Sequence, residues 1–161
     1  MEPKIVHNPK RKLIGQRMQM SFARYTAADL WKGFMPRLKE IENRSDADLI
    51  SVVIYPENHF DNFNPTNLFE RWAAAQVNNF DAVPSGMEAF LIPEGWYAVF
   101  EYRGMASNPA VFEYIFKRWL PTSDFNLDNR PHFEVLDHRY RNNDPSSEEQ
   151  IWIPIRPKVA R

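Results

Sequence analysis

One acidic residue stands out among the side chains capable of chemistry. Glu134 lies in the segment Pro131 to Val135 (PHFEV), directly after Phe133. Neighbouring side chains in a short strand point to opposite faces of a sheet, so Phe133 and Glu134 must meet different surroundings. The pattern by itself favours Glu134 in water and Phe133 in the core. In the opposite case the carboxyl group lies in an aromatic pocket, where it must pair with a cation, find hydrogen-bond donors or hold a proton.

The rest of the chain offers no familiar catalytic or metal-binding motif. The absence of cysteine excludes disulfides, thiolate zinc sites and cysteine nucleophiles. No G-x-S-x-G, H-E-x-x-H or phosphate-binding glycine loop occurs, and the four histidines are scattered. Asp124, Asp128 and the pair Glu148 and Glu149 fall in segments that we expect to be polar, solvent-facing loops. The sequence therefore predicts no metal, no cofactor and no catalytic residue marked by a motif.

Composition indicates a cytoplasmic globular protein. The 161 residues are 43% hydrophobic and 25% charged, which suits one domain with a core of its own. A net charge of -1 argues against direct binding to nucleic acid or to an anionic membrane. No apolar segment approaches the ~20 residues of a membrane helix, and Met1 to Lys12 does not resemble a signal peptide. Aromatic residues form 14% of the chain, and such rings either fill a core or line a ligand pocket.

The first half of the chain predicts a strand, a helix and two further strands. Strands are expected over residues 12–22, 49–55 and 69–77, a helix over residues 26–41 and a loop over residues 56–67. Thr26 with Asp29 resembles a capping box that begins the helix. Pro36 should remove one hydrogen bond of this helix and bend the helix.

The second half repeats this order. Strands are expected over residues 87–92 and 96–102, a helix over residues 108–120, a loop over residues 139–149 and strands over residues 133–136 and 151–155. Pro93-Glu94-Gly95 has the composition of a turn between the first two strands. Pro121 should end the helix.

The repeated order predicts one α+β domain over residues 1–161. Its two pseudo-repeats, about residues 5–80 and 85–158, each form a strand-helix-strand-strand unit, and no Pro/Gly-rich linker separates them. We expect the units to build a pseudo-symmetric antiparallel sheet with two long helices that flank a central pocket.

Four segments of the second half resemble GyrI-like small-molecule-binding domains, the effector-binding family of multidrug-responsive transcription regulators. They are, in order, residues 96–104 (WYAVFEYRG), 111–120 (VFEYIFKRWL), 131–135 (PHFEV) and 151–155 (IWIPI). The first half resembles the family in its element order and in Val53-Ile54-Tyr55 before a loop. The resemblance is clearest over residues 87–158.

The resemblance implies a ligand pocket between the two halves. The family's glutamate in the short strand, here Glu134, lies at the pocket floor and attracts cationic ligands. The aromatic residue of the last strand, Trp152, and the tyrosine that ends the second strand, Tyr55, would line the same pocket. Trp31 and Trp119, one in each helix, are further candidates, for which a place in the ordinary core is the alternative.

The leading functional prediction is binding of cationic or amphipathic small molecules without chemistry. A carboxylate attracts the cation, and ring faces hold it by cation–π contacts worth ~0.5–2 kcal/mol each. Because the sequence begins directly with a strand, we expect no DNA-reading domain of its own. Two modes of action stay open, which are sequestration of the ligand and transmission of a signal to a protein partner or within a homodimer.

Two alternatives come from the same resemblance. Some GyrI-like proteins hydrolyse cyclopropane-containing compounds with the pocket glutamate and an aromatic hydroxyl. Here Glu134 would be the acid or base and Tyr55 or Tyr114 the hydroxyl, since Trp152 has none. Two positions before the last-strand aromatic residue, the family often has an acidic residue, and this chain has Gln150 there. The other alternative is a protein-interaction module of the gyrase-inhibitor type, which predicts an exposed apolar patch away from Glu134.

Overall fold

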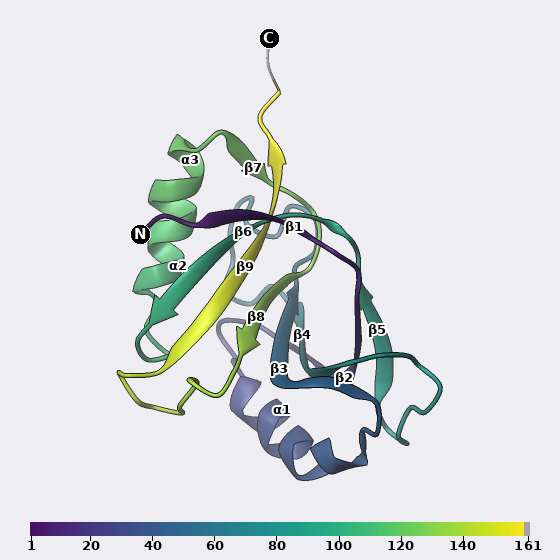
Figure 1. Cartoon of the computed structure of the whole chain (residues 1–161). Helices are drawn as coiled ribbons and strands as arrows, with labels where there is room; N and C mark the ends of the chain where they lie inside the picture. Colours follow the sequence, from purple (N-terminus) through teal and green to yellow (C-terminus); the bar gives the residue numbers. More distant parts are fainter. Residues whose placement is uncertain (160–161) are drawn as a thin grey trace.

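A curled sheet and two helices make up residues 1–159, which the computed structural model describes (Figure 1). The first half contains β1 (Lys4–Asn8), β2 (Arg11–Met20), α1 (Ala27–Phe34) with a 3-10 continuation (Met35–Glu40), β3 (Arg44–Ile54) and β4 (Phe69–Val77). The second half contains β5 (Glu88–Ile92), β6 (Gly95–Arg103), α2 (Ala110–Tyr114), a π-helical segment (Ile115–Trp119), α3 (Leu120–Thr122), β7 (Phe125–Leu127), β8 (His132–Leu136) and β9 (Glu148–Pro157). The predicted strand-helix-strand-strand order is confirmed as β2-α1-β3-β4 and, apart from the short β7, β6-α2-β8-β9.

The two units meet in the middle of one antiparallel sheet. Its central strands run in the order β6-β9-β8-β3-β4-β2. The junction is the pair β3 and β8, where Ile50 lies opposite Val135 and Ser51 opposite Glu134. Each unit therefore contributes three strands on its own side of the junction, which is the predicted pseudo-symmetry.

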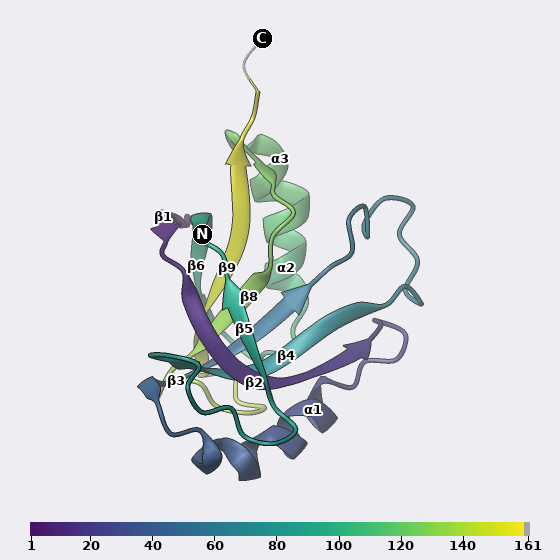
Figure 2. The same cartoon turned by 90° about the vertical axis from the view of Figure 1, so that its right-hand side faces the viewer.

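The strands β5 and β6 do not form the hairpin that Pro93-Glu94-Gly95 would suggest. Instead β1 pairs with β6 and β2 pairs with β5, without a change of register between Lys4 and Gly15. Pro9 and Pro93 interrupt this long ladder, because neither has an N–H group to donate. The ladder bends at this point and links the two ends of the sheet, which curls as Figure 2 shows.

Both helices cover the outer face of the curled sheet (Figures 1 and 2). Leu30 and Phe34 of α1 pack against β2 and β4 in one core. Val111 and Ile115 of the second helix pack on β6 and β9 in another. A third core fills the inner face of the curl. The sheet thus separates an inner apolar core from two outer cores, one under each helix.

The two prolines in the helices have different effects. At Pro36 the chain has already changed from α-helix to 3-10 helix, as a proline in a helix interior predicts. The prediction that Pro121 ends the second helix is wrong, because the helix continues to Thr122. The π-helical segment before Pro121 has wider turns, which give the ring room that a regular α-helix would deny it. Within residues 1–159 neither helix has the length and apolar character needed to cross a bilayer.

Candidate functional site

Glu134 lies on the outer face of β8, between the two helix-covered cores. Its cross-strand neighbours are Ser51 on β3 and Ile151 on β9. Ile151 belongs to the core under the second helix, and Val53 of β3 belongs to the core under α1. Phe133 packs in the inner core, so the prediction that it and Glu134 face opposite sides is confirmed. Glu134 is half-buried at the middle of the sheet.

Glu149 is a second acidic residue on this outer face. The strand β9 begins at Glu148, so the prediction that Glu149 lies in a solvent-facing loop is wrong. Glu149 is only 3% exposed and lies diagonally across from Glu134, since Glu134 is opposite Ile151 two residues further along β9. Two neighbouring carboxyl groups on a covered face disfavour each other's charged form. Burial, followed by the charge of Glu134, raises the pKa of Glu149 to about 9, while Arg71 acts in the opposite direction.

A buried cation lies near the two carboxyl groups. Arg71 of β4 is 9% exposed, and its Nη1 donates a hydrogen bond of 2.7 Å to Ser51 Oγ. Its Nε has no partner, and no ion pair joins Arg71 to an acidic residue in the described part of the chain. The guanidinium carbon lies 5.6 Å from the ring centroid of Tyr25. Arg71 is therefore a buried charge with only part of its hydrogen-bonding capacity used.

Three tyrosines surround these charges. Burial is the first cause that raises the pKa of Tyr25, Tyr55 and Tyr140, and the charge of Glu134 raises each of them further. Arg71 opposes the shift for Tyr25 and Tyr55. Tyr25 leaves 52% of its surface exposed, so this ring lies at the rim of the site. All three hydroxyl groups remain protonated at neutral pH and supply neutral donors beside the carboxyl groups.

One end of the site is built from aromatic rings. The ring centroids of Tyr55 and His132 lie 5.1 Å apart, and those of Tyr55 and Phe60 lie 4.8 Å apart. Phe60, in the loop between β3 and β4, reaches Phe116 of the second helix at 6.2 Å. Burial lowers the pKa of His132 to about 3, so its ring is neutral. The loop therefore connects the two halves of the molecule through stacked rings.

A cavity of about 260 Å³ opens at this aromatic end. Tyr55, His59, Phe60, Arg130 and His132 contribute to its walls. Its lining does not include Glu134 or Glu149, so the open space lies beside the carboxyl pair and not above it. Pockets for drug-sized ligands have volumes of roughly 300–1,000 Å³.

Trp152 is not in the place that the family resemblance implies. It lies on the inner face of the sheet, opposite Phe133, and the two rings stack at 5.0 Å with an interplanar angle of 19°. Arg11 covers the indole, with its guanidinium carbon 4.7 Å from the ring centroid. Strand alternation explains the difference, since Ile151 faces outward beside Glu134 and the next residue must face inward. The expected grouping of Trp152 with Glu134 is thus corrected by the structure.

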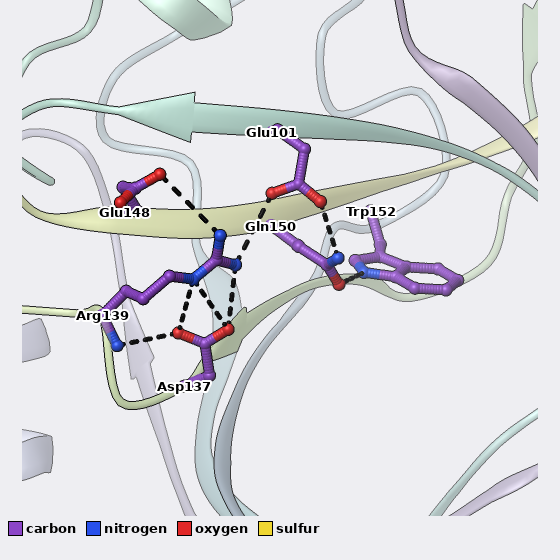
Figure 3. Close-up of polar contacts among 6 residues, drawn as sticks. All are labelled: Glu101, Asp137, Arg139, Glu148, Gln150 and Trp152. Carbon is purple, nitrogen blue, oxygen red and sulfur yellow. Dashed lines mark hydrogen bonds and ion pairs between the residues drawn. The ribbon is translucent and has the colours of Figure 1, made fainter.

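A polar cluster beside Trp152 fixes the loop between β8 and β9 (Figure 3). Arg139 donates a hydrogen bond of 2.9 Å to Asp137 and lies 3.7 Å from Glu101. The amide of Gln150 donates to Glu101 at 2.8 Å, and its oxygen accepts from the Trp152 indole at 3.2 Å. Gln150 therefore faces the Trp152 side of the sheet. Its polar atoms are engaged there, away from Glu134.

The helix tryptophans lie in the outer cores. Trp31 meets Phe34 edge-on at 5.8 Å and packs against the core under α1. Trp119 lies between Phe100, at 5.1 Å, and Phe125, at 6.4 Å. Neither tryptophan has a ring contact with Tyr55 or with the aromatic end of the site. Of the five predicted ligand-binding residues, the structure brings only Glu134 and Tyr55 together.

The chain can be assigned to a protein family. The family model Cass2, described as an integron-associated effector binding protein, matches residues 4–155. The chain belongs to this family. The resemblance to GyrI-like effector-binding domains is thereby confirmed over nearly the whole length of the chain.

Three similar proteins show how this Cass2 domain relates to others. It is 31% identical over 157 residues to the transcriptional regulator BrlR of Pseudomonas aeruginosa, and the match covers 96% of this chain and 56% of BrlR. The fold matches SAV2435 bound to tetraphenylphosphonium, with a TM-score of 0.69, 17% identity and coverage of 97% and 94% of the two chains. It also matches a hydrolase from Listeria innocua, with a TM-score of 0.60, 12% identity and coverage of 96% and 92%. At these identities the two solved structures show a shared fold.

Proposed function

We propose that this Cass2 domain binds small organic cations on the outer face of its sheet, between α1 and the second helix. The observation that carries the proposal is the carboxyl pair of half-buried Glu134 and buried Glu149, for which residues 1–159 provide no ion-pair partner. An apolar cation gains from such a site in two ways. The carboxyl pair offsets its charge, and the rings of Tyr25, Tyr55 and Phe60 cover its apolar surface.

The relatives support this chemistry. Tetraphenylphosphonium, the ligand of SAV2435, is a permanently charged ion with four aromatic rings. BrlR is a transcriptional regulator that includes a segment similar to this chain. We infer a sensing or sequestering role, in which the bound cation either signals to a partner protein or is simply withheld.

The experiment compares two glutamate variants of the full chain with tetraphenylphosphonium as the probe. Glu134→Gln removes the charge at the site, and Glu101→Gln removes a charge on the opposite face, where the side chain is 55% exposed. Ligand at 100 times its Kd stabilises the wild type by about 2.7 kcal/mol in thermal unfolding. We expect Glu101→Gln to keep this shift and Glu134→Gln to lose most of it. Equal shifts in both variants, or none in the wild type, would contradict the proposal.

Hydrolysis is the second candidate, and the observation that favours it is the pairing of a buried carboxyl group, Glu149, with a half-buried one, Glu134. One protonated and one ionised carboxyl group are the acid and base of many hydrolytic sites. Tyr55 is the available hydroxyl, because Tyr114 donates its proton to the Met1 carbonyl at 2.9 Å. Conversion of a cyclopropane-containing electrophile to its ring-opened product, detected by mass spectrometry and lost in Glu134→Gln, would favour this function.

The exposed rings fit ligand binding better than a separate docking surface. Phe22, Phe60 and Phe63 are between 42% and 49% exposed. Phe63 contacts both Phe22 and Phe60, and Phe22 and Phe60 also contact Tyr55. The patch therefore adjoins the aromatic end of the site, whereas the interaction module would require a patch away from Glu134.

A further inference from the structure

The site by itself is close to electrical balance. Glu149 is 3% exposed and lies diagonally across from Glu134, so burial favours one proton on the pair; the pair then carries a single negative charge and Arg71 a single positive charge. The other titratable groups that interact with Glu149 are Tyr25 before α1, Tyr102 on β6 and Tyr140 in the loop before β9, and all three are neutral. Nothing in this set attracts a further cation strongly while the proton remains.

Glu149 has the features of a binding group that is not in use. It is 3% exposed, and its Oε2 makes no hydrogen bond although it is buried. Buried acceptors normally have a partner, because water has been removed from them. Its diagonal neighbour Glu134 shares the same face, so a cation beside one carboxyl group lies close to the other.

A cation that enters the site upsets the balance unless another positive charge leaves. Arg71 cannot lose its proton at neutral pH. The most weakly held positive charge is the proton on the pair, since burial beside Glu134 is what raises the pKa of Glu149. Loss of this proton gives the pair two negative charges, which offset Arg71 and the ligand together.

We propose that Glu149 is a second ligand-binding carboxylate, and that a cationic ligand binds by displacing the proton that burial places on this carboxyl group. This inference rests on the proposed function. The exchange is balanced, because one ligand charge enters and one proton passes to solvent. It predicts a preference for permanently charged cations, such as quaternary ammonium and phosphonium ions, whose affinity rises with pH.

The test is isothermal titration of the full chain with tetraphenylphosphonium in two buffers with different ionisation enthalpies, at pH 6, 7 and 8. The difference in heat between the buffers gives the number of protons released. For the wild type we expect close to one proton, and an affinity that rises by up to about tenfold per pH unit. Glu149→Gln should bind with little pH dependence and release almost no proton. Glu101→Gln should behave as the wild type.

The outcomes separate the two proposals. Binding to the wild type without proton release would overturn the role of Glu149 and leave the proposed function intact. No binding to the wild type would overturn both. Proton release that persists in Glu149→Gln would assign the proton to another group and also overturn the inference. The wild-type titration is decisive even where the glutamine variant does not fold.

Discussion

Each face of the sheet holds an arginine against aromatic side chains, and these two arginines, half-buried Arg11 and buried Arg71, differ in what they contact. On the inner face Arg11 donates to Asn8 at 2.7 Å and to Gln76 at 3.0 Å, and it lies 4.7 Å from the Trp152 ring centroid. On the outer face Arg71 has one side-chain acceptor, Ser51, and a buried Nε without a partner. Two nitrogens of Arg11 therefore have side-chain acceptors, whereas only one nitrogen of Arg71 has one.

We infer from this difference that Arg11 has a structural role and that Arg71 has hydrogen-bonding capacity left for a ligand. A buried polar atom without a partner destabilises the fold, typically by about 1–3 kcal/mol. The outer face has two such atoms, Arg71 Nε and Glu149 Oε2, whereas Arg11 has no buried atom without a partner. We interpret the outer face as a site whose partners arrive with the ligand, and the inner face as a core.

The largest expected effect is that of Trp152→Ala on stability. Removal of this indole, which contacts both Phe133 and Arg11, should lower the free energy of unfolding by about 3–5 kcal/mol, measured by urea denaturation. The affinity of the folded protein for tetraphenylphosphonium should stay within about twofold. Trp152→Phe serves where the alanine variant unfolds. A large loss of affinity with little loss of stability would place Trp152 in the ligand site and break the contrast between the faces.

The two arginines should respond differently to the same change. Arg11→Met loses two hydrogen bonds and its ring contacts, so we expect a loss of about 2–3 kcal/mol in urea denaturation. Arg71→Met loses one hydrogen bond, and we expect about 1 kcal/mol. It should also tighten cation binding severalfold, because a competing positive charge has gone. The reverse order of stabilities would show that the unpaired Nε is not a sign of an available group.

The smallest effect concerns acid stability. Burial lowers the pKa of His132 from 6.5 to about 3, so between these values the unfolded chain binds a proton that the folded protein does not. The contribution of neutral His132 to the free energy of unfolding is therefore fully present above pH 6.5. It is lost as the pH falls, by at most about 1.4 kcal/mol per pH unit. In His132→Phe this slope should be smaller between pH 6.5 and 5, measured as urea midpoints. His7→Asn, at an exposed histidine, is the control and should keep the wild-type slope.

Local patterns predicted the elements and one half of the site. Alternation along β8 separated Phe133 from Glu134, and the same rule applied to residues 69–77 (FERWAAAQV) puts Arg71 on the face of Ala73 and Ala75. An arginine on a strand face otherwise formed by small apolar residues is therefore a sequence signal for a buried charge. In the last strand, the spacing of Glu149 from Ile151 was a similar signal, hidden by a predicted strand start three residues too late.

The remaining features depend on pairing between distant segments. The ladder of β1 and β2 with β5 and β6 joins residues more than 70 positions apart, and Pro93-Glu94-Gly95 carries a local turn signal that this ladder overrides. The position of Trp152 also follows from register, which places it opposite Phe133. The family resemblance assigned Trp152 to the pocket because the residue is aromatic. The type of a residue does not determine which face of a strand it occupies.

The bent ladder that links the two ends of the sheet also constrains how the chain folds. The first strand has Lys4 opposite Val99, and the junction of β3 with β8 requires residues 132–136. During synthesis the N-terminal strand therefore waits, unpaired, until about two thirds of the chain has been made. Such long-range pairing slows folding and leaves a strand edge open to other chains in the meantime. Lys4 lies on that strand, and a charged side chain is one of the features that disfavour pairing of an open strand edge with other chains.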